Sequence, residues 1–599
     1  MRRLRSITGW QSRSRVSLEI KTAPADSDPY ALRIARQLAS WYDAVGIDAS
    51  VVPLAEEELY RKLLLDHDFD VFVGRLTPGI RRPDDLYALL HSQYANAPGW
   101  QNPFGYANLG VDERLVRQRQ TTTTRRQRTV ARLQRSIART QPFTTLVAPD
   151  DVRAVRTSRF DGWTTGALDA PTGFLALQPA PGASSYETET LRVVVTDDRV
   201  TENLNPLAVE YRRGGFVMDL LYDSLGYATA DGTVEPWLAA SWDVTTNDPA
   251  PTATVTLRED LTWHDGEPLT AGDVAFTFRF LADTTLDDGS SGGTSTGTTT
   301  TTVRTDASGG TTPTATTNTD TRTLPAPRFQ GRAGLVRDAR VLDEQTVEMQ
   351  FVNCEPHVAK HAFTVPLLPE HVWVERTGKA SISGIEFGAA TEALVTDNVP
   401  PVGSGAFEYA SHAPRESLEL ERFDEYFLER DTAPNVGRHL GDGPAFDRLS
   451  VQTVGSDSTA VEMVADDEAD VTGTPVGAST VPRIGRSNDL DLLVAPSDQP
   501  YVVGYNAERE PLTNPRFRNT LARLVDQSSI ANDTFTRYAT PVASPLAGTR
   551  WLPDDLAYDE THPVTPFLGE DGELNVRKAR RVFQEAGFEF ADGHMVRTD

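Results

Sequence analysis

The sequence is short of cysteine and of long apolar runs. Cys354 is the single cysteine among 599 residues, so the chain can form no internal disulfide and no metal site of paired thiolates. No apolar run approaches the ~18 residues that a membrane-spanning helix needs. Residues 1–18 contain Arg2, Arg3 and Arg5 but no apolar segment behind them, and they do not match a secretory signal. These absences predict a soluble globular chain and leave its export undecided.

Basic residues are outnumbered by acidic ones. Lys and Arg total 58 against 85 Asp and Glu, a net charge of −27 that argues against a nucleic-acid partner, because phosphates would be repelled. Acid excess, abundant threonine and few lysines are typical of halophilic archaeal proteins, whose dispersed surface carboxylates keep the fold hydrated in high salt. The alternative is an acidic mesophilic protein. The lysines are Lys21, Lys62, Lys360, Lys379 and Lys578.

Two stretches of low complexity interrupt the chain. Residues 284–327 are rich in Thr, Ser and Gly and poor in residues that could fill a core, which predicts a disordered surface insertion. Residues 164–190 are rich in Pro, Gly and Ala and predict a linker or surface crossing. The chain is therefore expected to contain an N-terminal segment and a longer second segment.

The N-terminal segment carries alternating strand and helix patterns. Alternation over residues 16–20 predicts a strand, and Asp28 and Gly46 are expected to begin and end a helix. A strand over 47–54, a helix over 56–65 and a strand over 69–73 follow. The second segment mixes strands and helices in the same way from Leu191 onward. An α/β fold follows from these patterns.

The most specific motif is VTLREDLTWHDGEPLTAGDVAFTFRF, residues 255–280. It predicts a strand, a tight turn at Asp265 and Gly266, and a helix capped by Thr270. This stretch resembles the hallmark of family 5 extracellular solute-binding proteins, the dipeptide, oligopeptide and nickel binders of ABC importers. The resemblance continues in the family's order at residues 191–206, 222–225, 236–242, 368–373, 401–407, 421–426, 468–471, 505–518 and 577–588.

The family's final part resembles the N-terminal segment instead of following residue 599. Its counterparts are at residues 45–47, 68–70, 102–106 and 111–112. The family's elements thus occur in rotated order, which implies either a circular permutation or two joined gene pieces. If the chain is permuted, its end and the strand at Val16 should be neighbours in space.

The resemblance implies a two-lobed α/β fold of the class II periplasmic-binding-protein type, with mixed sheets and a third, smaller subdomain. We expect the second lobe to comprise residues 16–100 and 480–599. The first lobe is expected over 101–222 and 351–479, including the linker 164–190. The smaller subdomain is expected over 223–350, with the disordered insertion 284–327.

The resemblance also implies a non-enzymatic function without a cofactor. Family members close their lobes over a small solute, here a peptide or a sugar-like or anionic compound, and present it to an ABC permease. We expect a monomer at the cell surface or outside the cell, although the sequence has no signal peptide or lipobox. The rivals are a cytoplasmic ligand sensor that has kept the binding fold, a hydrolase, and a non-functional product of gene rearrangement.

Three segments are expected by position to face the ligand cleft. The first is the loop at Asn205, and the second is the strand that contains Tyr501, Tyr505 and Asn506. The third is the loop over residues 74–85. Each residue also has an ordinary structural interpretation, as a strand end or a turn residue.

The loop over residues 74–85 departs from the family's pattern. In similar peptide binders this loop carries an aspartate that pairs with the ligand's amino terminus. Here it contains Arg75 and Arg82, and only Asp84 or Asp85 could replace that aspartate. The arginines favour a ligand with an anionic group and make peptide specificity doubtful.

No motif demands catalysis or a metal. His357 and His361 stand four residues apart beside Cys354, a spacing that could bind a metal on one helix face, but a helical surface pair is the simpler interpretation. We assign no metal ligand. The sequence shows no P-loop, nucleophile elbow or complete dinucleotide fingerprint, and we predict no catalytic residue.

Overall fold

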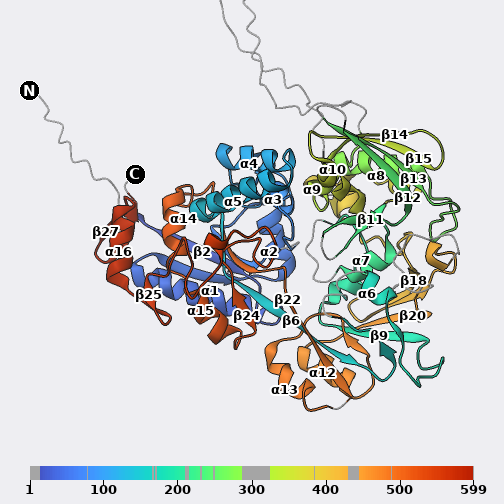
Figure 1. The fold of residues 1–599 in the computed structure, drawn as a ribbon. Coiled ribbons are helices and arrows are strands. Elements are labelled where there is room, and N and C mark those ends of the chain that lie inside the picture. The colour runs from blue at the N-terminus through green and yellow to red at the C-terminus, as the bar shows by residue number, and fades with distance from the viewer. Residues whose placement is uncertain are drawn as a thin grey trace, which may run out of the picture.

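The computed structural model describes residues 14–76, 79–164, 168, 171–208, 215–229, 232–246, 250–286, 324–382, 385–429, 444–487 and 489–597. Most of the predicted insertion 284–327 and the C-terminal Asp599 therefore lie outside the described residues. Figure 1 shows two bodies. We call the first the terminal body, residues 14–147 and 501–597, and the second the central body, residues 152–490. Each body has its own hydrophobic core.

The terminal body is built on a mixed five-stranded sheet in the order β3-β2-β4-β23-β5. The strands β2, β3 and β4 are parallel, and β23 runs antiparallel between β4 and β5. Because β23 comes from the far end of the sequence, both ends of the chain complete one sheet. The strands are β2 (Ser17–Thr22), β3 (Asp48–Pro53), β4 (Val71–Arg75), β5 (Phe143–Thr145) and β23 (Tyr501–Tyr505).

Helices pack against this sheet through two apolar clusters. Asp28 caps α1 (Pro29–Val45) by accepting a hydrogen bond from the Ala31 amide, and Gly46 ends the helix in the left-handed conformation, as predicted. The larger helices of the terminal body are α1, α2 (Glu56–Leu64), α3 (Asp85–Leu90), α4 (Leu109–Arg119), α5 (Thr123–Thr140), α14 (Pro515–Ala522) and α16 (Val576–Glu585).

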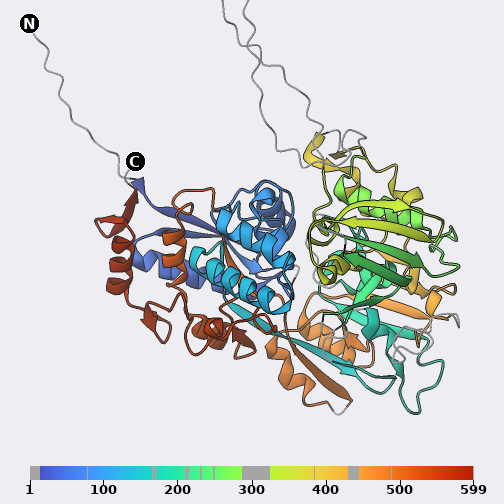
Figure 2. The same cartoon turned by 45° about the horizontal axis from the view of Figure 1, so that its top comes forward.

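The two ends of the chain are paired. Strand β1 (Ser14–Arg15) is antiparallel to β28 (His594–Arg597), with Ser14 opposite Arg597. The Val16 amide then donates to the Met595 carbonyl at 2.9 Å. Figure 2 shows this N-terminal strand beside the C-terminal segment. The expected proximity of the strand at Val16 to the chain's end is confirmed as far as the described residues reach.

The central body contains a larger mixed sheet in the order β18-β19-β20-β9-β21-β6-β22. A second, antiparallel sheet in the order β12-β13-β15-β14 is covered by α8 (Ala271–Ala282). Helix α8 begins with a capping box between Thr270 and Asp273, and Gly266 has a φ of 84°, so the predicted helix cap and turn are confirmed. The strands are β6 (Val147–Arg156), β9 (Thr190–Val195), β12 (Ala239–Thr246), β13 (Pro251–Leu257), β14 (Val336–Val341), β15 (Thr346–Phe351), β18 (Phe407–Ala413), β19 (Ser417–Arg422), β20 (Arg448–Thr453), β21 (Val471–Thr472) and β22 (Leu490–Pro496).

The chain passes between the bodies through two neighbouring antiparallel strands. Strand β6 begins beside β24 (Ala539–Pro541) of the terminal body and continues along β22 of the central sheet. Strand β22 then leads into β23 of the terminal sheet. This pair of crossings is the main covalent link between the bodies.

The structure corrects two parts of the expected organisation. Helices α4 and α5 lie in the terminal body, because Leu115, Val130 and Leu133 pack in one cluster with Phe69 and Phe72, whereas residues 101–222 were assigned to the other lobe. The predicted linker 164–190 is not a solvent crossing over its whole length. Phe174, Leu175 and Leu177 are buried in the central core.

The described residues otherwise agree with the expected fold class. Both bodies contain helices and a mixed sheet, which confirms the predicted α/β fold class. Within these residues, no helix combines the length and apolar character needed to span a bilayer. The separate smaller subdomain over 223–350 stays a prediction.

Candidate functional site

A pocket opens in the terminal body near the carboxyl ends of two parallel strands. Ala23 follows β2, and Gly74 and Arg75 end β4. Ligands of α/β sheets commonly bind at this edge. The pocket is small, since the space inside it that a water-sized group can occupy is about 10 Å³, roughly the room of one water molecule. Its lining comprises Ala23, Asp28, Ala31, Leu59, Tyr60, Leu63, Phe72, Val73, Gly74, Arg75 and Trp100.

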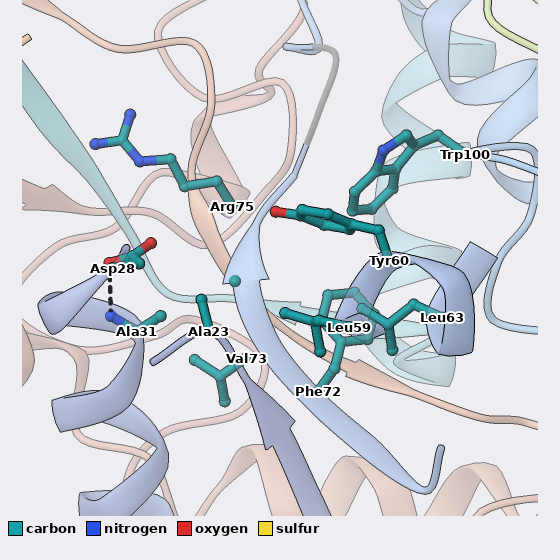
Figure 3. A pocket seen from close by; sticks show the side chains of 11 residues that line it. Ala23, Asp28, Ala31, Leu59, Tyr60, Leu63, Phe72, Val73, Arg75 and Trp100 are labelled. Carbon is teal, nitrogen blue, oxygen red and sulfur yellow. Dashed lines mark hydrogen bonds between the residues drawn. The ribbon is translucent and has the colours of Figure 1, made fainter. Parts of the chain in front are cut away.

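The pocket has an apolar side and a charged side. Figure 3 shows Tyr60 and Trp100 on one side and Asp28 and Arg75 on the other. The rings of Tyr60 and Trp100 have centroids 6.2 Å apart. The two polar groups carry opposite charges, and aromatic walls with a few fixed polar groups are typical of small-molecule sites. As it stands this arrangement has room for little more than a water molecule, so a polar organic molecule would need the pocket to open further.

Asp28 and Arg75 are held in place by Tyr501 and Asp151. The Tyr501 hydroxyl donates to the Asp28 carboxylate at 3.0 Å, and the Arg75 guanidinium lies 5.2 Å from the centre of the Tyr501 ring. Arg75 also forms an ion pair with Asp151 of β6, at 3.9 Å. Tyr501 thus contacts both Asp28 and Arg75 without lining the pocket itself. Arg75 connects the pocket to β6, the strand that leads into the central body.

The helix that supplies Tyr60 also contacts the central body. Glu56, at the start of α2, pairs with Arg199 at 2.9 Å, and both side chains are largely buried. Glu57 pairs with Arg415 at 3.2 Å on the exposed side of the same contact. Burial lowers the pKa of Arg199, but Asp197 and Glu56 outweigh burial and raise it above its usual value. The pocket therefore lies beside the contact between the bodies.

Two residues predicted from strand β23 support the fold instead of lining the pocket. Tyr505 is buried, its hydroxyl lies 2.9 Å from that of Thr144, and burial raises its pKa to about 12. The Asn506 side chain donates to the carbonyls of His67 and Phe69, both at 3.0 Å. Of the three residues predicted on this strand, Tyr501 comes closest to the pocket.

Asn205 is fully buried in the central body. Its side chain donates to the carbonyls of Ala393 and Thr396, both at 2.8 Å, and accepts from the Leu207 amide at 2.7 Å. This bonding fixes the local backbone. A role for Asn205 in ligand binding stays a prediction.

Asp84 already forms hydrogen bonds with other side chains of the protein. Its carboxylate is 3% exposed and accepts two hydrogen bonds from Arg119, at 2.5 and 3.1 Å, and one from Gln118. Burial raises the pKa of Asp84, but the Arg119 guanidinium more than offsets this and the net shift is downward. Arg82, by contrast, lies 3.8 Å from Asp85 and has one guanidinium nitrogen, Nη1, without a hydrogen-bond partner. Arg82 is thus the more available of the two.

His361 does not form the expected surface pair with His357. Helix α10 (Pro356–Ala359) ends before His361, which is 6% exposed, whereas His357 contacts Arg126. Burial first, and then nearby Arg82, lower the pKa of His361 to about 3. Over the described ranges, no set of three or more His, Cys, Asp or Glu side chains is arranged to hold a metal ion.

The sequence did not predict that Tyr60, Trp100 and Asp28 would line a pocket. Asp28 was identified as a helix cap, and that role is confirmed, but nothing in its spacing indicated a second one. Trp100 lies in a stretch rich in Asn, Gly and Pro that carries no periodicity. These three residues meet only because α1, α2 and the loop at 98–105 pack on the same edge of the sheet.

Curated relatives match part of this chain. A peptide transport periplasmic protein, SapA of Salmonella typhimurium, is 24% identical over 263 residues, which are 43% of this chain and 41% of the relative. The glutathione-binding protein GsiB of Escherichia coli is 22% identical over 188 residues, 31% and 32% of the respective chains. The match thus spans less than half the length of these relatives.

Solved structures give more distant likenesses. NikZ from Campylobacter jejuni, in complex with Ni(L-His), has a TM-score of 0.45 and 16% identity over 69% of this chain and 66% of its own. The oligopeptide-binding protein AppA from Bacillus subtilis, in complex with a nonapeptide, has a TM-score of 0.43 and 16% identity over 69% and 67%.

A sequence family also matches this chain. The model of the bacterial extracellular solute-binding proteins, family 5, matches residues 233–598, which is more than half of this chain. The match includes the motif at residues 255–280 that suggested the same family. The chain therefore belongs to the family 5 bacterial extracellular solute-binding proteins.

Proposed function

We propose that this chain is the solute-binding component of an ABC-type importer. It captures a small organic solute, a peptide or another polar molecule, beside the contact between its two bodies and presents it to a membrane permease. The observation that carries the proposal is the pocket lined by Asp28, Arg75, Tyr60 and Trp100. This pocket lies at one edge of the terminal sheet, next to the central body. The family membership and the peptide- and glutathione-binding relatives support it.

We infer that each pocket residue binds a different part of the solute. Tyr60 and Trp100 contact the apolar part of the solute, Asp28 accepts hydrogen bonds, and Arg75 donates to an acceptor or anion. Movement about the crossing strands β6 and β22 would open and close the two bodies, and contacts such as Glu56 with Arg199 would favour the closed form. The solute shifts the balance toward that form only if it binds the closed form better. No catalytic step is part of this proposal.

The rotated order of the family's elements is proposed to be a circular permutation. The insertion of β23 between β4 and β5 and the pairing of β1 with β28 support one terminal body made from both ends of the chain. A product of gene rearrangement without function would have no reason to keep an ordered polar pocket. The acidic, lysine-poor composition supports a halophilic source.

The second candidate is a cytoplasmic ligand sensor that keeps the same pocket. Cell fractionation separates the two. A membrane-associated or extracellular pool is expected for the importer component, and a purely cytoplasmic protein would support the sensor.

Calorimetry with a mixed set of short peptides, glutathione and neutral sugars tests the pocket directly. We expect Tyr60→Ala to weaken binding of any solute that the wild type binds by about tenfold, or about 1.4 kcal/mol, because an aromatic wall of the pocket is lost. Tyr186→Ala is the matched control, since Tyr186 is 84% exposed. Equal affinity in both variants, or turnover of the solute, would contradict the proposal.

A further inference from the structure

Helix α2 contributes both to the pocket and to the contact between the bodies. Leu59, Tyr60 and Leu63 of this helix line the pocket (Figure 3). The first turn of the same helix is acidic and forms ion pairs with Arg199 and Arg415 of the central body. Because α2 has only nine residues, a shift of its first turn also moves the side chains that line the pocket.

The contact between Arg199 and α2 is largely buried. The Arg199 guanidinium lies 2.9 Å from the Glu56 carboxylate and 3.3 Å from the carboxylate of Asp197, which belongs to the same body as the arginine. Burial lowers the pKa of this guanidinium, but the two carboxylates and then Tyr60 raise it above its usual value. Separating a buried ion pair leaves a charge without its partner, which is costly. This pair therefore fixes the first turn of α2 on the central body.

Arg415 stands at a backbone position that favours glycine. It lies in the tight turn between β18 and β19, where the Glu416 amide donates to the Ala413 carbonyl at 2.9 Å. Pro414 precedes it, and Arg415 has a φ of 64°, in the left-handed region that a β-carbon makes unfavourable. Glycine would suit this turn better, which points to a role for the arginine side chain outside the hairpin.

The Arg415 side chain connects carboxylates of both bodies. Its guanidinium donates to Glu202 of the central body at 3.1 Å and to Glu57 of α2 at 3.2 Å. Asp198 of the central body lies 3.9 Å away. An exposed ion pair on its own stabilises little, because two long side chains lose freedom when it forms. Here the two carboxylates of the central body already orient the arginine toward α2, so less freedom is lost when the bodies meet.

We propose that Arg199 and Arg415 form a latch that couples closure of the two bodies to the position of α2, and hence to the shape of the pocket. The inference rests on the proposed function and names the contact that regulates its site. With the latch formed, α2 and its pocket side chains are fixed on the central body. With the latch broken, the acidic first turn of α2 loses both cations and the pocket wall is free to move. The two arginines are positioning residues, because they act on the pocket through α2.

The distance between the bodies, measured without solute, tests the latch. Spin labels on Leu109→Cys of the terminal body and Val341→Cys of the central body report this distance by double electron–electron resonance. Both positions are exposed, and the native Cys354 is buried. Because no solute is present, the result does not depend on what the pocket binds.

We expect each latch variant to reduce the share of molecules with a short distance between the labels. Arg199→Gln should lower the ratio of closed to open molecules by about tenfold, because Glu56 loses its partner at a largely buried contact. Arg415→Gln should lower this ratio by about threefold, as an exposed pair contributes less. Arg199→Lys keeps the charge and should restore part of the loss. Adding Glu57→Gln to Arg415→Gln should change the ratio little further, because both remove the same contact.

Two further variants separate a latch from a merely structural role. Arg415→Gly relaxes the turn, so it should leave the thermal unfolding midpoint unchanged or higher while lowering the ratio of closed to open molecules as much as Arg415→Gln. Arg340→Gln is the matched control, because Arg340 pairs with Glu348 at 3.5 Å on the surface of one body and should leave the ratio unchanged.

The outcomes also separate this inference from the proposed function. A wild-type ratio in Arg199→Gln and Arg415→Gly, or an equal decrease in Arg340→Gln, overturns the latch while leaving solute binding in the pocket intact. If Arg199→Gln does not fold, the exposed Arg415 variants decide the question. A pocket that binds no solute contradicts the proposed function and leaves the measured ratios unchanged.

Discussion

The terminal and central bodies use the chain in different ways. The central body pairs many strands with their neighbours in sequence, as in the hairpins of β12 with β13, β14 with β15, and β18 with β19. The terminal body places β23 between β4 and β5, so this internal strand, the fourth of five, is separated from both of its neighbours by hundreds of residues. A sheet does not need contiguous sequence if each strand carries the correct apolar pattern and the ends meet.

This difference predicts that the terminal body depends on the long-range strand. Val503 is fully buried in the middle of β23, so Val503→Asp places an unpaired charge in the core and should destabilise the terminal body by about 3–5 kcal/mol. Val494→Asp on β22 is the control, because Val494 is 40% exposed and the change should cost less than about 1 kcal/mol. Denaturant unfolding followed by circular dichroism measures both.

The same two variants can contradict the claimed difference between the terminal and central bodies. If Val503→Asp loses no more stability than Val494→Asp, the C-terminal strand is not part of the terminal core. If only one of two unfolding transitions shifts, the bodies unfold separately and the damaged one is identified.

A smaller effect is expected from acid at the contact between the bodies. Burial is the main cause that lowers the pKa of His361, to about 3, so the folded protein keeps this side chain neutral while the unfolded chain protonates near its usual pKa of about 6.5. The unfolded state then binds more protons, and stability falls as the pH drops from about 6.5 toward 3. Thermal unfolding across this range should show the decline.

Replacing His361 sharpens that expectation. His361→Gln should flatten the loss of stability between pH 6.5 and 4, whereas His371→Gln should leave it unchanged because the side chain of His371 is 39% exposed. The buried His562 and the half-buried His264 contribute to the remaining slope, since burial lowers the pKa of each to about 4. An identical slope in the wild type and His361→Gln would show that His361 is not buried at a stable contact.

Local features of the fold were predictable, and long-range ones were only partly so. The cap at Asp28, the C-terminal Gly46 and the capping box at Thr270 follow from short sequence patterns because the interactions span three or four residues. The position of α4 and α5 could not be predicted, because an amphipathic pattern shows that a helix has a buried face but does not show which core that face contacts. Burial of the segment at 174–177 was hidden for the same reason.

The candidate site shows the same limit. Arg75 was predicted from the loop that departs from the family's pattern, and it does line the pocket. Asn205, Tyr505 and Asn506 have polar side chains in the expected segments, but their hydrogen bonds go to the protein's own groups. Tyr60 and Trp100 carry no sequence signal, since their role depends on three elements that meet only in the folded chain.

The central claim is that the two bodies close on a solute. Small-angle X-ray scattering of the wild type, with and without a solute that calorimetry shows to bind, measures this most directly. The account predicts a smaller radius of gyration and a narrower distance distribution in the presence of the solute, and a loss of this change in Tyr60→Ala at the same solute concentration. Identical scattering curves at saturating solute would contradict it.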